Sequence, residues 1–295
     1  MDRAFVVKDG RLVGLDRKRT IADGYRAVVA GSVDQVGRLD LAAVAVAAAG
    51  EPAPAGDVAL RDVVAATAVL VGKDLRIEHR SREGLLTTVF FALSCVLVFS
   101  FALVRNGTPA PDAGPAVLWV AVALSGTLAM ARTFERERSA GTLAAILVSP
   151  APRPAVFLGK WIALMALLFA VEAILLPLVA LFFQMPIGGQ PWAILALLAA
   201  GTAGYAAIGT LFAAMLARTR TRDVLLPLLL YPMSVPIIIG GVRGTAAALA
   251  DPYVPGQVSL WLSLLICFDA VFVTLALWTF GTLMIEAAPR VAKEA

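Results

Sequence analysis

Six apolar runs, each long enough to cross a lipid bilayer, constrain this chain more than any other feature. No Asp, Glu, Lys or Arg occurs between residues 85 and 104, and about twenty apolar residues in a helix span the roughly 30 Å hydrocarbon layer. A backbone in lipid must satisfy its own hydrogen bonds, so the runs are expected to be helices. The predicted spans are residues 85–104, 115–131, 156–183, 192–217, 224–242 and 260–285. The sequence therefore predicts an all-α membrane protein with six transmembrane helices.

The positions of the charged residues predict the orientation of these spans. The chain is 60% hydrophobic and only 16% charged, and its charges lie in blocks between the apolar runs. Basic residues gather at alternate ends of the spans, near residues 73–82, 132–160, 218–222 and 290–293, whereas only Arg105 and Arg243 fall at the opposite ends. Because basic loops stay on the cytoplasmic side, we expect a multi-pass protein of the bacterial inner membrane with both termini in the cytoplasm. The segment before residue 85 is too long and too charged for a signal peptide.

Two elements are predicted before the first span. Apolar residues alternate around Asp9 and Gly10, which is typical of a β-hairpin over residues 4–15. A helix is predicted over residues 57–82, with basic residues gathered at its end. Such an amphipathic helix would lie in the cytoplasmic interface, with its arginines near anionic headgroups. Its predicted apolar face consists of Leu60, Val64, Thr67, Val71 and Leu75.

The loop between the second and third spans carries an unusual pattern. A dense mixed-charge cluster over residues 132–138 must lie in water. Ser139 can then cap a short helix whose apolar positions recur three and four residues apart, and prolines at 150, 152 and 154 would end it. Two interpretations stay open: a helix that rests on lipid headgroups, or an element that takes a push from a soluble partner and passes it to the spans.

Two acidic residues fall inside predicted spans, Glu172 in the third and Asp269 in the sixth. A charge at the bilayer centre costs about 2.5 to 3.5 kcal/mol on insertion scales. Each acid is either a proton or substrate contact or a protonated, hydrogen-bonded packing residue. We favour packing, because the spans offer no obvious basic partner.

Proline and small residues shape the fourth and fifth spans. Pro227, Pro232 and Pro236 are expected to kink or break the fifth span, and residues 245–257 are expected to form an external loop or a re-entrant helix. Small residues of the fourth span suit close helix packing: they are Ala200, Gly201, Gly204 and Gly209.

The sequence motifs that would indicate ATP binding or hydrolytic catalysis are absent. No GxxxxGK[ST], GxSxG or HExxH sequence occurs, so any energy from ATP is expected to come from another chain, and no catalytic residue is predicted. His79 is the only histidine, which excludes a bis-histidine heme site within one chain. We therefore expect no metal or cofactor bound by this chain.

Five segments, taken in order, resemble the CcmB-like family of ABC-2 type permeases, the B subunit of the cytochrome c maturation heme exporter. The resemblance covers roughly residues 70–285, and the last motif makes it specific. The sequence departs from the family pattern at Arg136 and Arg138, where acidic residues are favoured, at Gly240 and Gly241, where Phe-Gly is common, and at Glu172. The motifs are KDLRIEHRSREGLLTTVFF, GPAVLWVAVALSG, RTFERERSAGTLAAILVSP followed by Lys160, GTAGYAAIGTLFAAML and LPLLLYPMSVPIIIGG.

The resemblance implies a permease that works with partners: a CcmA-like ABC ATPase subunit that binds ATP, a heme-handling CcmC-like subunit and a small CcmD-like subunit. The assembly would contain a permease homodimer, with heme as a possible substrate, and would release a heme-loaded chaperone. Residues 134–150 would be the coupling helix in the ATPase groove, with a polar rim, a glycine for close approach, an apolar anchor and a terminating proline. Its residues are Phe134, Glu135, Arg138, Gly141, Thr142, Leu143, Ile146, Leu147 and Pro150.

Two other functions stay open beside heme export. The chain could be a mechanical transmitter that remodels a heme-handling partner without moving heme, or a generic ABC-2 exporter of lipid or drug.

The implied organisation is an extension and linker over residues 1–56, the interfacial helix over 57–84, a six-span permease domain over 85–286 and a cytoplasmic tail over 287–295. Residues 4–15 resemble strands near the C-terminus of ABC ATPases, and an unrelated hairpin is the alternative.

Overall fold

The computed structural model describes residues 4–8, 11–15, 60–110, 112–139, 153–216 and 221–286. The chain divides into two compact units, Met1–Pro54 with Arg290–Ala295, and Ala55–Pro289. In the first unit, β1 (Ala4–Lys8) pairs with β2 (Arg11–Leu15) in an antiparallel sheet, with Lys8 opposite Arg11. The predicted hairpin is confirmed.

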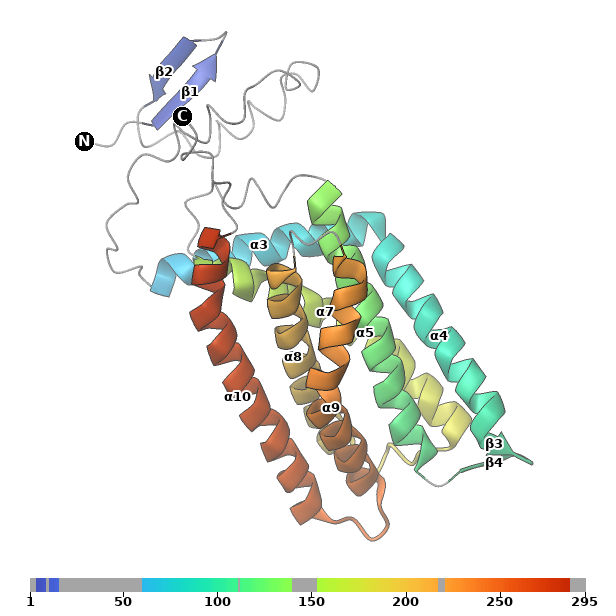
Figure 1. Cartoon of the computed structure of the whole chain (residues 1–295). Helices are drawn as coiled ribbons and strands as arrows, with labels where there is room; N and C mark the ends of the chain where they lie inside the picture. Colours follow the sequence, from blue (N-terminus) through green and yellow to red (C-terminus); the bar gives the residue numbers. More distant parts are fainter. Residues whose placement is uncertain are drawn as a thin grey trace. The chain divides into compact units, whose positions relative to one another are not determined.

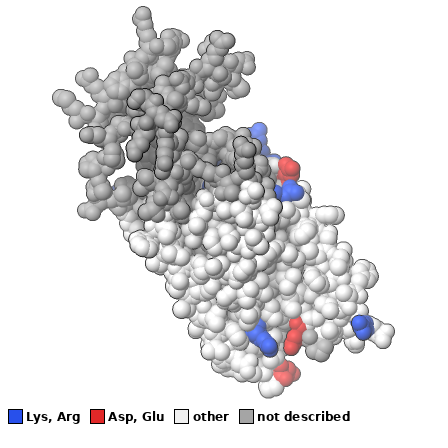
Figure 2. Space-filling model, in the orientation of Figure 1, with Lys and Arg blue, Asp and Glu red and all other residues white. Residues whose placement is uncertain are grey.

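The second unit is a bundle of long helices (Figure 1). Among its described residues, six helices are long and apolar enough to cross a membrane, which confirms the predicted all-α membrane protein. On the face shown in Figure 2, charged atoms lie near the two ends of the described surface and leave an uncharged band between them. A short hairpin of β3 (Val104–Arg105) and β4 (Thr108–Pro109) follows the first span. The helices are α3 (Leu60–Ser81), α4 (Glu83–Leu103), α5 (Ala113–Ser139), α7 (Arg153–Phe183), α8 (Pro191–Met215), α9 (Arg222–Leu249) and α10 (Pro255–Glu286).

Helix α3 runs across the ends of the spans rather than along them (Figure 1). The predicted helix is confirmed, and its predicted apolar face is only partly covered by the bundle. Leu60 is 79% exposed and Val64 60% exposed, whereas Thr67 is buried and Leu70 contacts α7. The apolar side chains left exposed on α3 suit a helix that lies in a membrane interface.

Arg82 forms the corner between α3 and α4. Its φ of 52° is left-handed, a conformation that is uncommon outside glycine. The Glu78 Oε1 atom accepts a hydrogen bond from the Leu85 backbone N–H at 2.7 Å, so a side chain of α3 caps the first turn of α4. The interfacial helix and the first span are therefore joined by a defined turn.

The helices α5 and α8 lie at the centre of the bundle. About three quarters of the apolar window of each is buried, 78% and 72%, against 17% for α4 and 11% for α10. Gly201 of α8 packs on Trp119 of α5, and Gly209 packs on Met130. A Cβ at either glycine would overlap those side chains, so the predicted small-residue packing is confirmed.

Helix α9 is a single helix that contains Pro227, Pro232 and Pro236, so the expected breaks are not present. Neighbouring helices can compensate for the backbone bonds that proline removes within a membrane bundle. The helix also continues past residue 242, because Gly241 packs on Trp119 and Gly244 on Leu197. The loop predicted over residues 245–257 is therefore wrong at both ends, because residues 245–249 belong to α9 and residues 255–257 to α10; the connection is residues 250–254.

Helix α5 extends beyond the predicted second span. The charged residues 132–138 continue it to Ser139. The short helix that Ser139 was predicted to cap would lie beyond residue 139, outside the described residues. Arginine and glutamate are good helix formers, which explains why the charge cluster continues the helix.

Candidate functional site

The predicted coupling segment lies between α5 and α7. Phe134, Glu135 and Arg138 belong to the last turns of α5. The rest of the segment lies outside the described residues, namely Gly141, Thr142, Leu143, Ile146, Leu147 and Pro150. What the structure does describe is how α5 and α7, which lead into and out of residues 140–152, are held.

The end of α5 is tied to the first span. Arg132 Nη1 donates a hydrogen bond to Thr87 Oγ1 of α4 at 3.2 Å. Thr87 in turn donates to the backbone oxygen of Glu83 at 2.6 Å, in the first turn of α4. The charged end of α5 is therefore fixed to the start of the span that follows α3.

The beginning of α7 is tied to α3 by a buried ion pair. Lys160 Nζ lies 2.6 Å from Asp74 Oδ2, and the two side chains are only 6% and 14% exposed. Lys73 Nζ lies 3.1 Å from the other carboxylate oxygen of Asp74. Close packing adds to the ion pair, because a Cβ on Gly159 would lie 2.8 Å from the Leu70 Cβ. A buried charge is costly unless it is paired, so this contact fixes how α3 lies on α7.

Sequence reasoning missed Asp74. The available signal was Lys160, a lysine inside an otherwise apolar helix, since such a residue requires a partner. Both helices that frame residues 140–152 are thus attached to the α3–α4 unit. A displacement of that segment would reach the interfacial helix and the first span through these contacts.

The two acids inside the spans contact α8 at different residues. Glu172 of α7 is buried and accepts a short hydrogen bond from the Thr202 hydroxyl. Asp269 of α10 lies against Gly204, and its Oδ1 atom has no hydrogen-bond partner among the described residues. The structure therefore gives Glu172 a neutral hydroxyl partner.

A buried polar layer inside the bundle was also missed. Trp119 Nε1 donates to Thr245 Oγ1 at 3.0 Å, which joins α5 to α9. The Tyr205 hydroxyl of α8 lies 2.7 Å from Thr127 Oγ1 and donates to the backbone oxygen of Ala123 at 2.6 Å. Hydrogen bonds of this kind hold transmembrane helices together.

These features define a class: a multi-pass helical membrane protein with an interfacial helix before its first span and a charged helix end after its second. The chain belongs to the CcmB family. The family model described as CcmB protein matches residues 65–286, which include most of α3 and all six spans. The family predicted from the motifs is therefore confirmed.

Relatives in three bacteria carry the name Heme exporter protein B. The Bradyrhizobium diazoefficiens protein is 28% identical over 191 residues, which cover 63% of this chain and 84% of the relative. The Rhodobacter capsulatus protein is 29% identical over 184 residues, 61% of this chain and 84% of the relative. The Pseudomonas aeruginosa protein is 27% identical over 197 residues, 66% of this chain and 86% of the relative. The similarity thus extends over most of each relative.

Proposed function

We propose that this chain is the permease subunit of a heme exporter for cytochrome c maturation, in the bacterial inner membrane with both termini in the cytoplasm. The observation that carries the proposal is the CcmB family match over α3 and all six spans. The name shared by the relatives supports heme as the cargo. Heme is then a substrate and not a resident cofactor of this chain.

The proposal includes a separate CcmA-like ATPase that binds ATP, together with CcmC-like and CcmD-like subunits and a second copy of the permease. Residues 134–150 would seat in the ATPase groove. The attachments of α5 and α7 support this role, because Arg132 contacts Thr87 and Lys160 pairs with Asp74. A push on the segment would reach α3 and α4 directly.

Deletion of the gene tests the role in cytochrome c maturation. We expect loss of cytochromes that hold heme covalently, measured by heme staining of denaturing gels, and restoration when the chain is supplied again. Cytochromes that hold heme without covalent attachment serve as the control and should persist. Normal covalent cytochromes in the deletion strain would contradict the proposal and favour a generic lipid or drug exporter.

A second mode of action, a mechanical transmitter, is favoured by the packing of Trp119. This side chain is 2% exposed, packs on Gly201 and Gly241, and donates to Thr245. The Trp119 side chain therefore fills the space between α5, α8 and α9 around these contacts. In the transmitter mode, ATP hydrolysis moves this subunit and so frees the heme-loaded chaperone, and no heme crosses the chain.

Reconstitution separates the two modes. Vesicles that contain the permease and the ATPase, without the CcmC-like subunit, are loaded with ATP and heme. The transmitter mode predicts ATP hydrolysis without heme flux. ATP-dependent heme flux in these vesicles would contradict that mode and support direct transport.

A further inference from the structure

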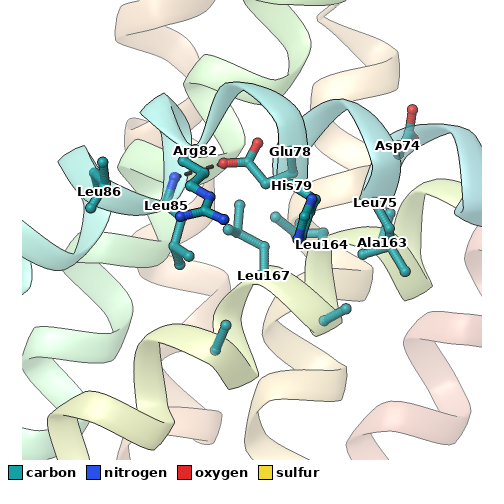
Figure 3. A pocket seen from close by; sticks show the side chains of 12 residues that line it. Asp74, Leu75, Glu78, His79, Arg82, Leu85, Leu86, Ala163, Leu164 and Leu167 are labelled. Atoms are coloured by element: carbon teal, nitrogen blue, oxygen red, sulfur yellow. Dashed lines mark hydrogen bonds between the residues drawn. The ribbon is translucent and has the colours of Figure 1, made fainter.

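A cavity of about 610 Å³ lies beneath α3, between the start of α4 and the first half of α7 (Figure 3). Its size falls within the range of about 300 to 1,000 Å³ for ligand pockets. Its lining is polar at one edge and apolar elsewhere. Charged and polar side chains of α3 form one edge, and leucines and alanines of α4 and α7 form the remainder. A lining of this kind suits an amphiphile.

The acids at the polar edge are already engaged. Asp74 pairs with Lys160 at 2.6 Å and with Lys73 at 3.1 Å. Glu78 accepts the hydrogen bond from the Leu85 backbone. Both carboxylates line the cavity, but these contacts hold them on groups of the protein.

Arg82 and His79 are the groups left to meet a ligand. Figure 3 shows both side chains directed toward Leu164 and Leu167 of α7. Within the described parts of the chain, neither side chain forms a hydrogen bond or an ion pair. A guanidinium group presents several donors in a fixed plane, which suits an oxygen-rich anion such as a phosphate.

Two backbone hydrogen bonds fix the position of the Arg82 main chain, from which the guanidinium group extends. The Arg82 N–H donates to the Glu78 oxygen at 2.7 Å, and the Arg82 oxygen accepts from the Leu86 N–H at 2.9 Å. The residue is therefore held in its left-handed corner, above the apolar part of the cavity. Exposed apolar side chains of α4, Leu86 and Phe90, continue that apolar surface to the outside of the bundle.

We infer that this cavity binds one anionic phospholipid. The phosphate is held by Arg82 with His79 as a second contact, and an acyl chain lies along Leu85, Leu164 and Leu167. The cavity lies where α3 crosses the ends of the spans (Figure 1), and basic pockets between spans on the cytoplasmic side bind anionic headgroups. The lipid would bridge α3, α4 and α7, and the Lys160–Asp74 pair joins two of these helices, α3 and α7.

Native mass spectrometry of the purified full chain tests this inference. The protein is reconstituted in nanodiscs of phosphatidylcholine with 20% phosphatidylglycerol, about one lipid in five, extracted in mild detergent and examined for retained lipid. We expect one retained phosphatidylglycerol. Arg82→Gln should lower its occupancy about ten-fold, the loss expected when a charge-assisted hydrogen bond to the phosphate is removed.

Matched variants keep the test specific. Arg80→Gln removes the same charge from an exposed residue of α3 outside the cavity and should retain the lipid. Ala166→Phe fills the apolar floor and should release it, whereas Ala173→Phe changes an exposed residue of α7 outside the cavity and should not. If Arg82→Gln and Arg80→Gln lose the same amount of lipid, the loss is an effect of general surface charge. That result would contradict a specific lipid site at Arg82.

A parallel titration with hemin tests whether heme, which is also an amphiphile, binds this cavity instead of a phospholipid. Hemin binding is followed by its absorbance in wild type and in Arg82→Gln. Hemin that binds in an Arg82-dependent manner, with no retained phospholipid, would overturn the inference in favour of a heme site. The readout is lipid occupancy, so the result does not depend on whether the chain exports heme.

Discussion

The ammonium group of Lys160 lies 2.6 Å from a carboxylate oxygen of Asp74, and this buried ion pair joins the third span to the helix before the first. The two residues are 86 positions apart in the chain. The pair therefore fixes the beginning of α7 on α3. If residues 134–150 dock on an ATPase as proposed, this contact would link that segment to α3.

Loss of one partner of this pair should destabilise the protein. Lys160→Met leaves Asp74 without its closest cation, and breaking a buried pair costs about 3 to 5 kcal/mol. The thermal unfolding temperature in detergent should therefore fall strongly. Lys73→Gln is the matched control: Lys73 is 35% exposed, and an exposed pair contributes only about 0 to 1 kcal/mol.

Exchange of the two charges extends this test. The double variant Asp74→Lys with Lys160→Asp restores opposite charges across the contact, and it should recover part of the stability that either single variant loses. A Lys160→Met protein as stable as Lys73→Gln would show that the pair does not hold α3 on α7.

Gly201→Ala should destabilise the bundle, because the added Cβ overlaps the Trp119 ring. Overpacking of a tight interior costs about 1 to 3 kcal/mol. Gly72→Ala is the control, since nothing lies within 4 Å of its added Cβ and alanine is the better helix former by about 1 kcal/mol. The two changes should thus shift the unfolding temperature in opposite directions, and shifts of the same sign would contradict the packing described for α5 and α8.

Glu172→Gln should preserve both stability and cytochrome c maturation, because the amide oxygen can still accept the hydrogen bond from Thr202. Thr202→Val removes the donor and should cost only about 0.6 kcal/mol, the average for such bonds between spans. Unfolding temperature and heme staining are measured together. A Gln variant that is stable and assembled but inactive would instead make Glu172 a proton or substrate contact.

The spans and the family could be predicted from sequence because both depend on local patterns. A run without charge between residues 85 and 104 requires a helix in lipid whatever its neighbours are. The motif around Pro227, Pro232 and Pro236 indicated the family even though α9 is not broken there. Its continuation to Leu249 depends on contacts with Trp119 and Leu197, which a pattern along one segment does not contain.

The contacts that position the candidate site could not be predicted in the same way. Asp74 lies on a helix with several charged residues, and only the packing of α3 on α7 selects it as the partner of Lys160. Leu60 and Val64 share the predicted apolar face of α3 with Thr67, but only Thr67 is buried, because a helical repeat fixes spacing and not which residues a neighbouring helix covers. The docking role of Leu143 and its neighbours remains a prediction.

Co-purification of the ATPase subunit tests the central claim most directly. The tagged permease is expressed with the ATPase as wild type, as Gly141→Trp and as Leu143→Asp, and membrane insertion is measured in each. Leu60→Asp, which places a charge on the exposed part of α3 outside the cavity, is the control. We predict that the two variants of the proposed coupling segment insert normally but lose the ATPase, whereas Leu60→Asp retains it. Unchanged co-purification in Gly141→Trp and Leu143→Asp would contradict the account and indicate a segment that rests on lipid headgroups.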